Sequence, residues 1–323
     1  MSAAIAKARR FSSRGSLHRL TVRYDADQPI VGLLNSLETS LAQLQVLDLE
    51  SPLVTLGQVF GLAHRTLVLE SLTFSLADAI GPAFALPYAP TRPLPRLRRL
   101  HVRRGPSHPD TSGTVGTFAT IVRSFPVLEE LEIDHPGCML HPLPHHGQVV
   151  SVPVLRKLAL RNSRVRGQDY SLSIFSLPNL CDLDLSGSPD TSYIPYLFPP
   201  GLRPNTTHLT RLVLRGSIVD EPTLIRHLPH FGALTHLDVR RTSTTIVFGR
   251  AVLLPATSEA SPKVCALLER FDISLDNDEH GDFGVGWPVL FLDECLARRG
   301  VTLKVAVWLG SEIEWELDLR GPA

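Results

Sequence analysis

The sequence predicts an α/β solenoid, in which short parallel strands alternate with segments that return along the far side. A six-residue pattern, with leucine first and apolar residues fourth and sixth, occurs ten times; LRKLAL, which begins at Leu155, serves as the template. Successive first leucines are 25 to 34 residues apart. A consensus L-x-x-L-x-L at a period of about 20–29 residues is the sequence signature of leucine-rich repeats. We therefore expect a leucine-rich-repeat solenoid (horseshoe) of about ten to eleven degenerate repeats, with a parallel β-sheet on its concave face.

Each copy predicts one short strand. Its fourth and sixth positions are two residues apart, so their side chains share one face of the strand and point into the core. Positions 3, 5 and 7 then line the opposite, exposed face. One such unit cannot bury its apolar face alone, so neighbouring copies must stack. The copies begin at Leu17, Leu44, Leu69, Leu97, Leu128, Leu155, Leu180, Leu209, Leu234 and Leu268.

The segments between copies predict helical returns. Residues 28–41, 114–125 and 221–228 carry apolar residues at helical spacing, and 288–299 predicts a last helix. Proline stands two residues before a first leucine at Pro95, Pro126, Pro153 and Pro178. Because proline lacks an N–H and disfavours helix at the preceding residue, these prolines indicate where each return ends.

The domain organisation follows from the repeats. We expect a basic N-terminal tail over 1–16, a repeat domain over 17–307 and a C-terminal tail over 308–323. Each repeat of a solenoid contacts only its neighbours, so the chain need not divide into globules. We expect one elongated domain with a soft point in the long insertion between 240 and 268.

Composition limits the function classes. Lys plus Arg and Asp plus Glu number 32 each, so the formal net charge is zero. This argues against a general nucleic-acid or membrane-surface binder, which needs a basic excess. No run approaches the ~18 apolar residues of a membrane span. Four cysteines without paired spacing and no apolar signal sequence indicate a reduced chain, cytoplasmic or nuclear. The first 20 residues hold basic residues and serines but no acid, so a mitochondrial transit peptide is the alternative.

The exposed face of the predicted sheet is charged. From the fourth copy to the eighth, position 3 alternates in sign through Arg99, Glu130, Lys157, Asp182 and Arg211. Parallel strands lie about 4.8 Å apart, so these charges could pair across strands and fix the register. They could equally form a recognition face for a protein partner. The candidate partner-binding residues are Arg99, His101, Arg103, Glu130, Glu132, Asp134, Lys157, Arg161, Asp182 and Asp184.

Nucleic acid is an unlikely ligand of this face. The strand near Arg99 is basic, but acidic residues on the next strand, such as Glu130 and Glu132, largely cancel its charge. An RNA-associated scaffold would need a concave face that is basic throughout.

Metal and catalytic motifs are weak. Cys138, His141 and His145 have tolerable zinc spacing but lack a fourth ligand, which favours a Pro/His-rich insertion. Asp276 and the acidic residues after it resemble the start of a calcium loop, but Trp287 stands where a bidentate Glu is required. No nucleophile–base motif occurs. We expect no enzyme activity, no catalytic residues, no metal and no cofactor.

Four segments, LPRLRRLHV, FPVLEELEI, VPVLRKLAL and LPNLCDLDL, and the ending LDECLARRGVTLKVAV carry a family resemblance. Over residues 17–307 the chain resembles the leucine-rich-repeat region of F-box proteins from mushroom-forming (basidiomycete) fungi. In that family an N-terminal F-box docks the Skp adaptor of a cullin (SCF-type) ubiquitin ligase, and the repeats hold the substrate. The resemblance thus implies a protein–protein recognition scaffold that acts as a substrate receptor. Only 16 residues precede the first copy, without an LPxE-type F-box opening, so the alternative is an F-box-less adaptor with no ligase role.

Overall fold

A computed structural model shows how the repeats are built. It describes residues 18–23, 41–50, 66, 68–76, 94–104, 116–117, 125–134, 138–139, 150–161, 175–186, 208–216, 221–240, 242, 246–253, 267–274, 303–309 and 312–319. Contacts divide the chain into two compact units, Met1–Arg164 and Val165–Ala323, whereas the sequence predicts one domain with a soft point after residue 240.

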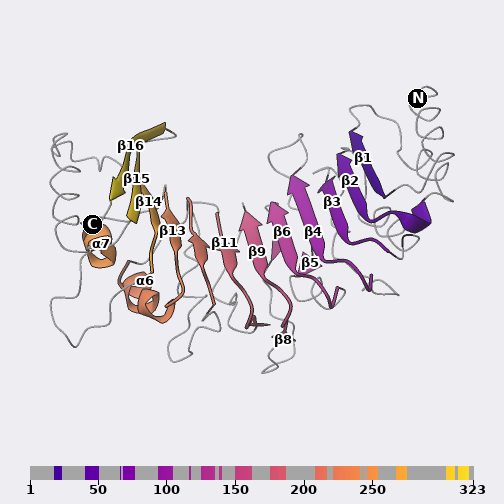
Figure 1. Ribbon diagram of the computed structural model, residues 1–323, viewed down its shortest axis with the longest axis horizontal. Helices are drawn as coiled ribbons and strands as arrows, with labels where there is room; N and C mark the ends of the chain where they lie inside the picture. The colour runs from indigo at the N-terminus through magenta and orange to yellow at the C-terminus, as the bar shows by residue number, and fades with distance from the viewer. Residues whose placement is uncertain are drawn as a thin grey trace. The chain divides into compact units, whose positions relative to one another are not determined.

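In the first unit, six copies of the template each form one strand (Figure 1). Neighbours pair in parallel, and position 3 of one copy faces position 3 of the next, as in Arg19↔Val46 and Arg99↔Glu130. As a result, the same template position lies side by side in successive repeats. The strands are β1 (Arg19–Arg23), β2 (Val46–Glu50), β3 (Ser71–Leu76), β4 (Arg99–Arg104), β6 (Glu130–Asp134) and β9 (Lys157–Arg161).

Shorter elements lie between these strands. They are a 3₁₀ turn η1 (Leu41–Gln43) and the two-residue strands β5 (Gly116–Thr117), β7 (Cys138–Met139) and β8 (Val150–Ser151). β5 and β7 pair with each other in parallel. The predicted helices over 28–41 and 288–299 lie outside the described residues, apart from residue 41. Of the helix predicted over 114–125, residues 116–117 form strand β5 instead, and most of the rest is not described.

The second unit continues the repeats with four further template strands and three other strands. β10 (Phe175–Ser176) precedes β11 (Asp182–Asp184), β12 (Arg211–Val213), β13 (His236–Val239) and β14 (Arg270–Ser274), which pair in parallel from β11 onward. β15 (Leu303–Leu309) adds to β14 in parallel, and β16 (Glu312–Leu319) closes this edge antiparallel to β15. The segment 308–323, predicted as a tail, thus contains the end of β15 and all of β16.

In the second unit, helices connect successive strands along the chain. α6 (Glu221–His227) runs into η4 (Leu228–His230), which confirms the predicted return over 221–228. α7 (Ile246–Leu253) follows β13, and Phe248 of α7 lies against Phe271 of β14 with ring centroids 6.4 Å apart. No helix among the described residues is long and apolar enough to cross a membrane.

The core consists of the template positions themselves. In every described copy after the first, the residues at positions 1, 4 and 6 are buried, for example Leu155, Leu158 and Leu160. In the first copy, at the β1 edge, Leu20 and Val22 are only half-buried. The predicted α/β leucine-rich-repeat fold is therefore confirmed: strands recur at the repeat period, pair in parallel and bury the same template positions.

Tight turns lead into the strands. The N–H of Leu155 donates to the carbonyl of Val152 at 3.4 Å, and the same three-residue closure precedes Leu97, Leu128 and Leu180. In these four turns proline is the second residue, where its fixed φ suits a type I or II β-turn. The prolines thus belong to the turn that enters the strand.

Backbone hydrogen bonds fix the register. In each junction within the two units one carbonyl, at position 2, accepts N–H groups from positions 2 and 3 of the next copy; Arg98, for example, accepts from Glu129 (2.8 Å) and Glu130 (2.9 Å). The arrangement recurs throughout both units. A slip of one residue would turn every core side chain outward, so this register also decides which charges become neighbours.

Candidate functional site

The charged face is the side of the sheet that carries positions 3, 5 and 7, and each unit has its own part of it. All ten candidate residues lie at these positions. The first unit holds eight of them on β4, β6 and β9, and the second holds Asp182 and Asp184 on β11. One expectation was wrong: Asp184 is not exposed but buried, with Ser186 donating to its carboxylate through both backbone N–H and hydroxyl.

In the first unit the candidate residues gather around Glu132. Lys157 Nζ lies 2.5 Å from Glu132 Oε1, while Arg161 Nη1 and His101 Nε2 lie 3.7 and 3.4 Å from Oε2. Three side chains that can carry positive charge thus surround one partly buried carboxylate, on three neighbouring strands.

This crowding changes the titration of the group. Burial alone would raise the pKa of Glu132, but the hydrogen bond from Lys157 and the surrounding positive charges outweigh it and hold that pKa below its ordinary value. Burial lowers the pKa of His101, and the charges of Arg103 and Arg161 lower it further, against the opposing effect of Glu132. His101 is therefore mainly neutral near pH 7, so Lys157 and Arg161 supply the charge that balances Glu132.

The predicted cross-strand ladder exists only in part. Arg99 Nε lies 3.4 Å from Glu130 Oε1, and beside them Arg98 Nη1 donates to Glu129 Oε1 at 2.9 Å. Lys157 is the neighbour of Glu130 on the next strand, but its ammonium group pairs with Glu132, whose side chain is less exposed than that of Glu130. The pairs of Arg98 and Arg99 are well exposed, and exposed pairs contribute only about 0–1 kcal/mol to stability.

A second cluster, which the sequence analysis did not single out, occupies β12 to β14 of the second unit. Its centre is Asp238, whose side chain is fully buried. Arg240 donates to it from Nε (2.9 Å to Oδ1) and from Nη2 (2.8 Å to Oδ2), and Arg215 donates from Nε (2.6 Å to Oδ2). One carboxylate therefore holds two guanidinium groups, one in a bidentate pair.

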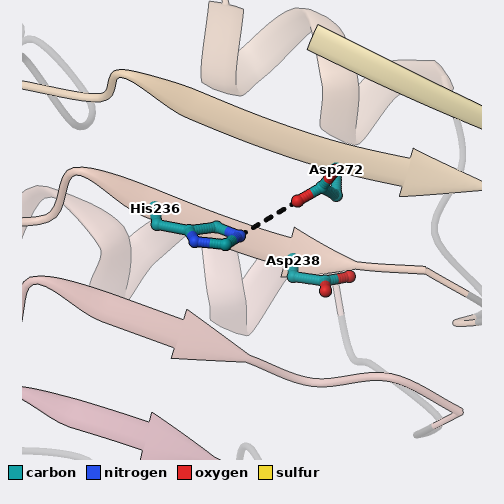
Figure 2. A group of neighbouring side chains, drawn as sticks. All are labelled: His236, Asp238 and Asp272. Carbon is teal, nitrogen blue, oxygen red and sulfur yellow. Dashed lines mark hydrogen bonds and ion pairs between the residues drawn. The ribbon is translucent and has the colours of Figure 1, made fainter. Parts of the chain in front are cut away.

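Asp272 repeats this arrangement on β14. Arg270 donates from Nε and Nη2 to its two oxygens, at 2.9 and 3.1 Å. His236 Nε2 lies 3.0 Å from Asp272 Oδ2, and because a carboxylate only accepts, the ring nitrogen is the donor (Figure 2). Burial alone would raise the pKa of Asp272, but the hydrogen bonds from His236 and Arg270 hold it far below its usual range.

The signal for this cluster is present in the sequence. Arg270 and Asp272 are two residues apart on one predicted strand, and Asp238 is likewise two residues before Arg240 at positions 5 and 7 of its copy, so each pair is expected on one face. An acid at position 5 beside an arginine at position 3 or 7 would have marked it.

A ring nitrogen of His236 and carboxylate oxygens of Asp238 and Asp272 lie within 4.8 Å of one another, and atoms of these kinds can bind a metal ion. The carboxylates, however, already accept from three guanidinium groups, and a divalent ion would have to displace or face these cations. The cluster is an ion-pair network. Of the earlier metal candidates, Cys138 lies in β7 with its side chain undescribed, and His141, His145 and the acidic loop from Asp276 lie outside the described residues.

The charges of the second unit are sorted by depth. Arg215 and Arg270 keep 44% and 41% of their side-chain surface exposed, whereas the carboxylates beneath them, Asp238 and Asp272, keep 0% and 1%. Three guanidinium groups face two carboxylates, and the surface presents the guanidinium groups of Arg215 and Arg270 while the acids are buried. Cancellation of signs in the sequence therefore does not make this part of the face neutral to a partner.

Comparisons with known proteins add similarity of shape only. No family model matches the chain, and neither does any curated protein. Among solved structures, the chain is similar to an internalin from Listeria monocytogenes, with 13% identity, a TM-score of 0.46, and coverage of 85% of this chain and 83% of the other. It is also similar to a leucine-rich-repeat protein of Leptospira interrogans, with 14% identity, a TM-score of 0.44, and coverage of 94% and 70%.

Proposed function

We propose that this chain is a protein-recognition scaffold that binds a partner through the charged face. One observation carries the proposal: in the second unit the guanidinium groups of Arg215 and Arg270 lie outermost on the face, while the carboxylates that hold them are buried. Stability alone does not call for this. Exposed ion pairs add little to it, and buried ones are often no better than apolar side chains of similar volume. What the arrangement provides is a set of oriented hydrogen-bond donors at the surface.

Catalysis has less support. His236 against Asp272 resembles a base with its orienting carboxylate. A working site needs a nucleophile or substrate group at the other side of the ring. Among the described residues, the ring of His236 is hydrogen-bonded to Asp272, and that carboxylate also accepts a hydrogen bond from Arg270. The pair fits a structural role within a binding surface.

A sharper version of the proposal rests on the family resemblance. In it the chain is the substrate-binding part of an SCF-type ubiquitin ligase and works with the Skp adaptor and a cullin in the cytoplasm or nucleus. The alternative is an adaptor with no ligase role. Affinity purification of the tagged chain from its own cells, followed by mass spectrometry, separates them: recovery of Skp and cullin supports the first, and recovery of other proteins without them supports the second.

The binding face itself is tested by charge reversal in the first unit. Arg99→Glu with Arg103→Glu should weaken capture of the recovered partner roughly tenfold, a change of ~1.4 kcal/mol. The matched control is Arg96→Glu with Arg156→Glu, which changes the net charge equally at exposed positions outside 3, 5 and 7. If the face pair lowers the melting temperature and leaves capture unchanged, the charges serve only as a structural ladder and the proposal fails.

A further inference from the structure

We infer that the second unit's part of the charged face docks an acidic segment of the partner protein. We call this part the arginine site: Arg215, Arg240 and Arg270 with His236, above Asp238 and Asp272. The inference rests on the proposed function and adds to it the place and the chemistry of the bound segment.

The guanidinium groups of the arginine site are held in position. A bidentate pair with a carboxylate fixes the plane of a guanidinium group. Arg240 and Arg270 each make such a pair with a buried aspartate, and Arg215 is fixed through its Nε. The buried acids thus orient the groups, while Arg215 and Arg270 remain well exposed.

Fixed donors favour binding. Ordering a long side chain at an interface costs about 0.5–1.5 kcal/mol, and a side chain already held by a buried carboxylate has lost much of that freedom beforehand. Guanidinium also matches the planar, two-oxygen geometry of a carboxylate, so the donors favour Asp and Glu over neutral polar residues.

The spacing suits an extended peptide. Arg215 follows the end of β12 and Arg270 begins β14, but their side chains reach toward neighbouring carboxylates: Nε of Arg215 lies 2.6 Å from Asp238, and Nε of Arg270 lies 2.9 Å from Asp272. Because oxygens of these two aspartates lie within 4.8 Å of one another, the two guanidinium groups are roughly 10 Å apart, close to the separation of residues three apart in an extended chain. Acidic side chains at that spacing could reach both arginines.

A nucleic acid is the less favoured occupant. Its binding depends on many phosphate contacts and on a basic excess that attracts it from a distance. This chain has a formal net charge of zero, and the cations of the arginine site span only three strands. A short acidic segment needs no more than this.

Fluorescence anisotropy on the intact chain tests the inference. The probes are a fluorescein-labelled decamer of glutamate, a matched decamer of glutamine, and a ten-nucleotide oligothymidylate. We expect the glutamate peptide to bind at least tenfold more tightly than either of the others. Equal binding of the glutamine peptide, tighter binding of the oligothymidylate, or no binding of the glutamate peptide overturns the inference.

Variants locate the site without unfolding it. Arg215→Lys with Arg270→Lys keeps a cation above each buried aspartate but removes the planar fork, and should weaken glutamate-peptide binding about tenfold. Arg99→Ala with Arg103→Ala, in the first unit, should change it less than twofold. Wild-type affinity of the lysine pair, or a loss confined to the first-unit pair, refutes the inference. Partner capture that still responds to Arg99→Glu with Arg103→Glu would then leave the proposed function standing.

Discussion

Substitution of Asp238 by alanine should destabilise the protein more than any other single change on the charged face. Asp238 is fully buried and accepts from Nε and Nη2 of Arg240, from Nε of Arg215, and from the backbone N–H of Arg240 at 3.2 Å. The substitution removes every one of these acceptors and leaves two cations without their counter-charge.

The magnitude follows from the depth of each partner. Breaking a buried ion pair by removal of one member costs about 3–5 kcal/mol. Arg215 is 44% exposed, so water replaces much of its lost partner and its share falls below about 1 kcal/mol. Arg240 is only 14% exposed and carries most of the cost. We expect a loss near the lower end, about 3 kcal/mol, which for a unit of this size lowers the melting temperature by about 6–12 °C.

Urea denaturation followed by circular dichroism, with calorimetry, measures this loss. The matched control is Asp182→Ala, because Asp182 also pairs with an arginine on the neighbouring strand (2.8 Å to Arg211 Nη1) but both members are partly exposed. It should cost less than about 1 kcal/mol. In a double-mutant cycle with Arg240→Ala, the unfolding free energies lost in the two single variants should add up to at least about 1 kcal/mol more than the loss in the double variant. If Asp238→Ala costs no more than Asp182→Ala, or the cycle shows additivity, the depth argument is wrong.

Two further predictions concern pH and the turns. Because the folded pKa of Asp272 lies below its ordinary value of 3.8, its carboxylate contributes stability above that value, and the contribution is lost as pH falls toward the folded pKa. The gap between the urea midpoints of wild type and Asp272→Asn should therefore be constant above about pH 5 and should narrow progressively as the pH falls below about 4. A gap that stays constant down to about pH 3 would contradict the assignment. Pro153→Ala should lower the unfolding free energy by about 0.4–1 kcal/mol, since the proline presets the turn that Leu155 closes; an unchanged urea midpoint would show that the turn forms equally well without it.

Strand positions were predictable because the repeat supplies both period and phase. β6 and β9 begin at Glu130 and Lys157, which are position 3 of their copies, and both strands end at position 7. Core burial followed from the same template. β16 was missed because the template does not include it, although EIEWELDL alternates charged and apolar residues through the whole strand.

The sequence predicts which side of the sheet carries the candidate residues, but not how deeply each side chain is buried. Period-2 alternation places positions 3, 5 and 7 on one side of the sheet, and Arg99 with Glu130 pairs as that geometry requires. It does not show that position 5, in the middle of the strand, becomes buried in the later copies. Ala159, Asp184 and Val213 are buried there, as are the two aspartates of the arginine site, whereas His101 and Glu132 at the same position are only half-buried.

Depth also bears on the choice between a structural ladder and a recognition face. A ladder of exposed pairs would hold acids and bases at similar exposure, as Arg99 and Glu130 do, and would present both signs to a partner. In the arginine site the acids lie below and the guanidinium groups above, so the same ion pairs that balance the charge also orient the donors outward. The same arrangement can then serve both ion pairing and recognition. A net charge of zero describes the sum of the charges, whereas a partner contacts only the outer ones.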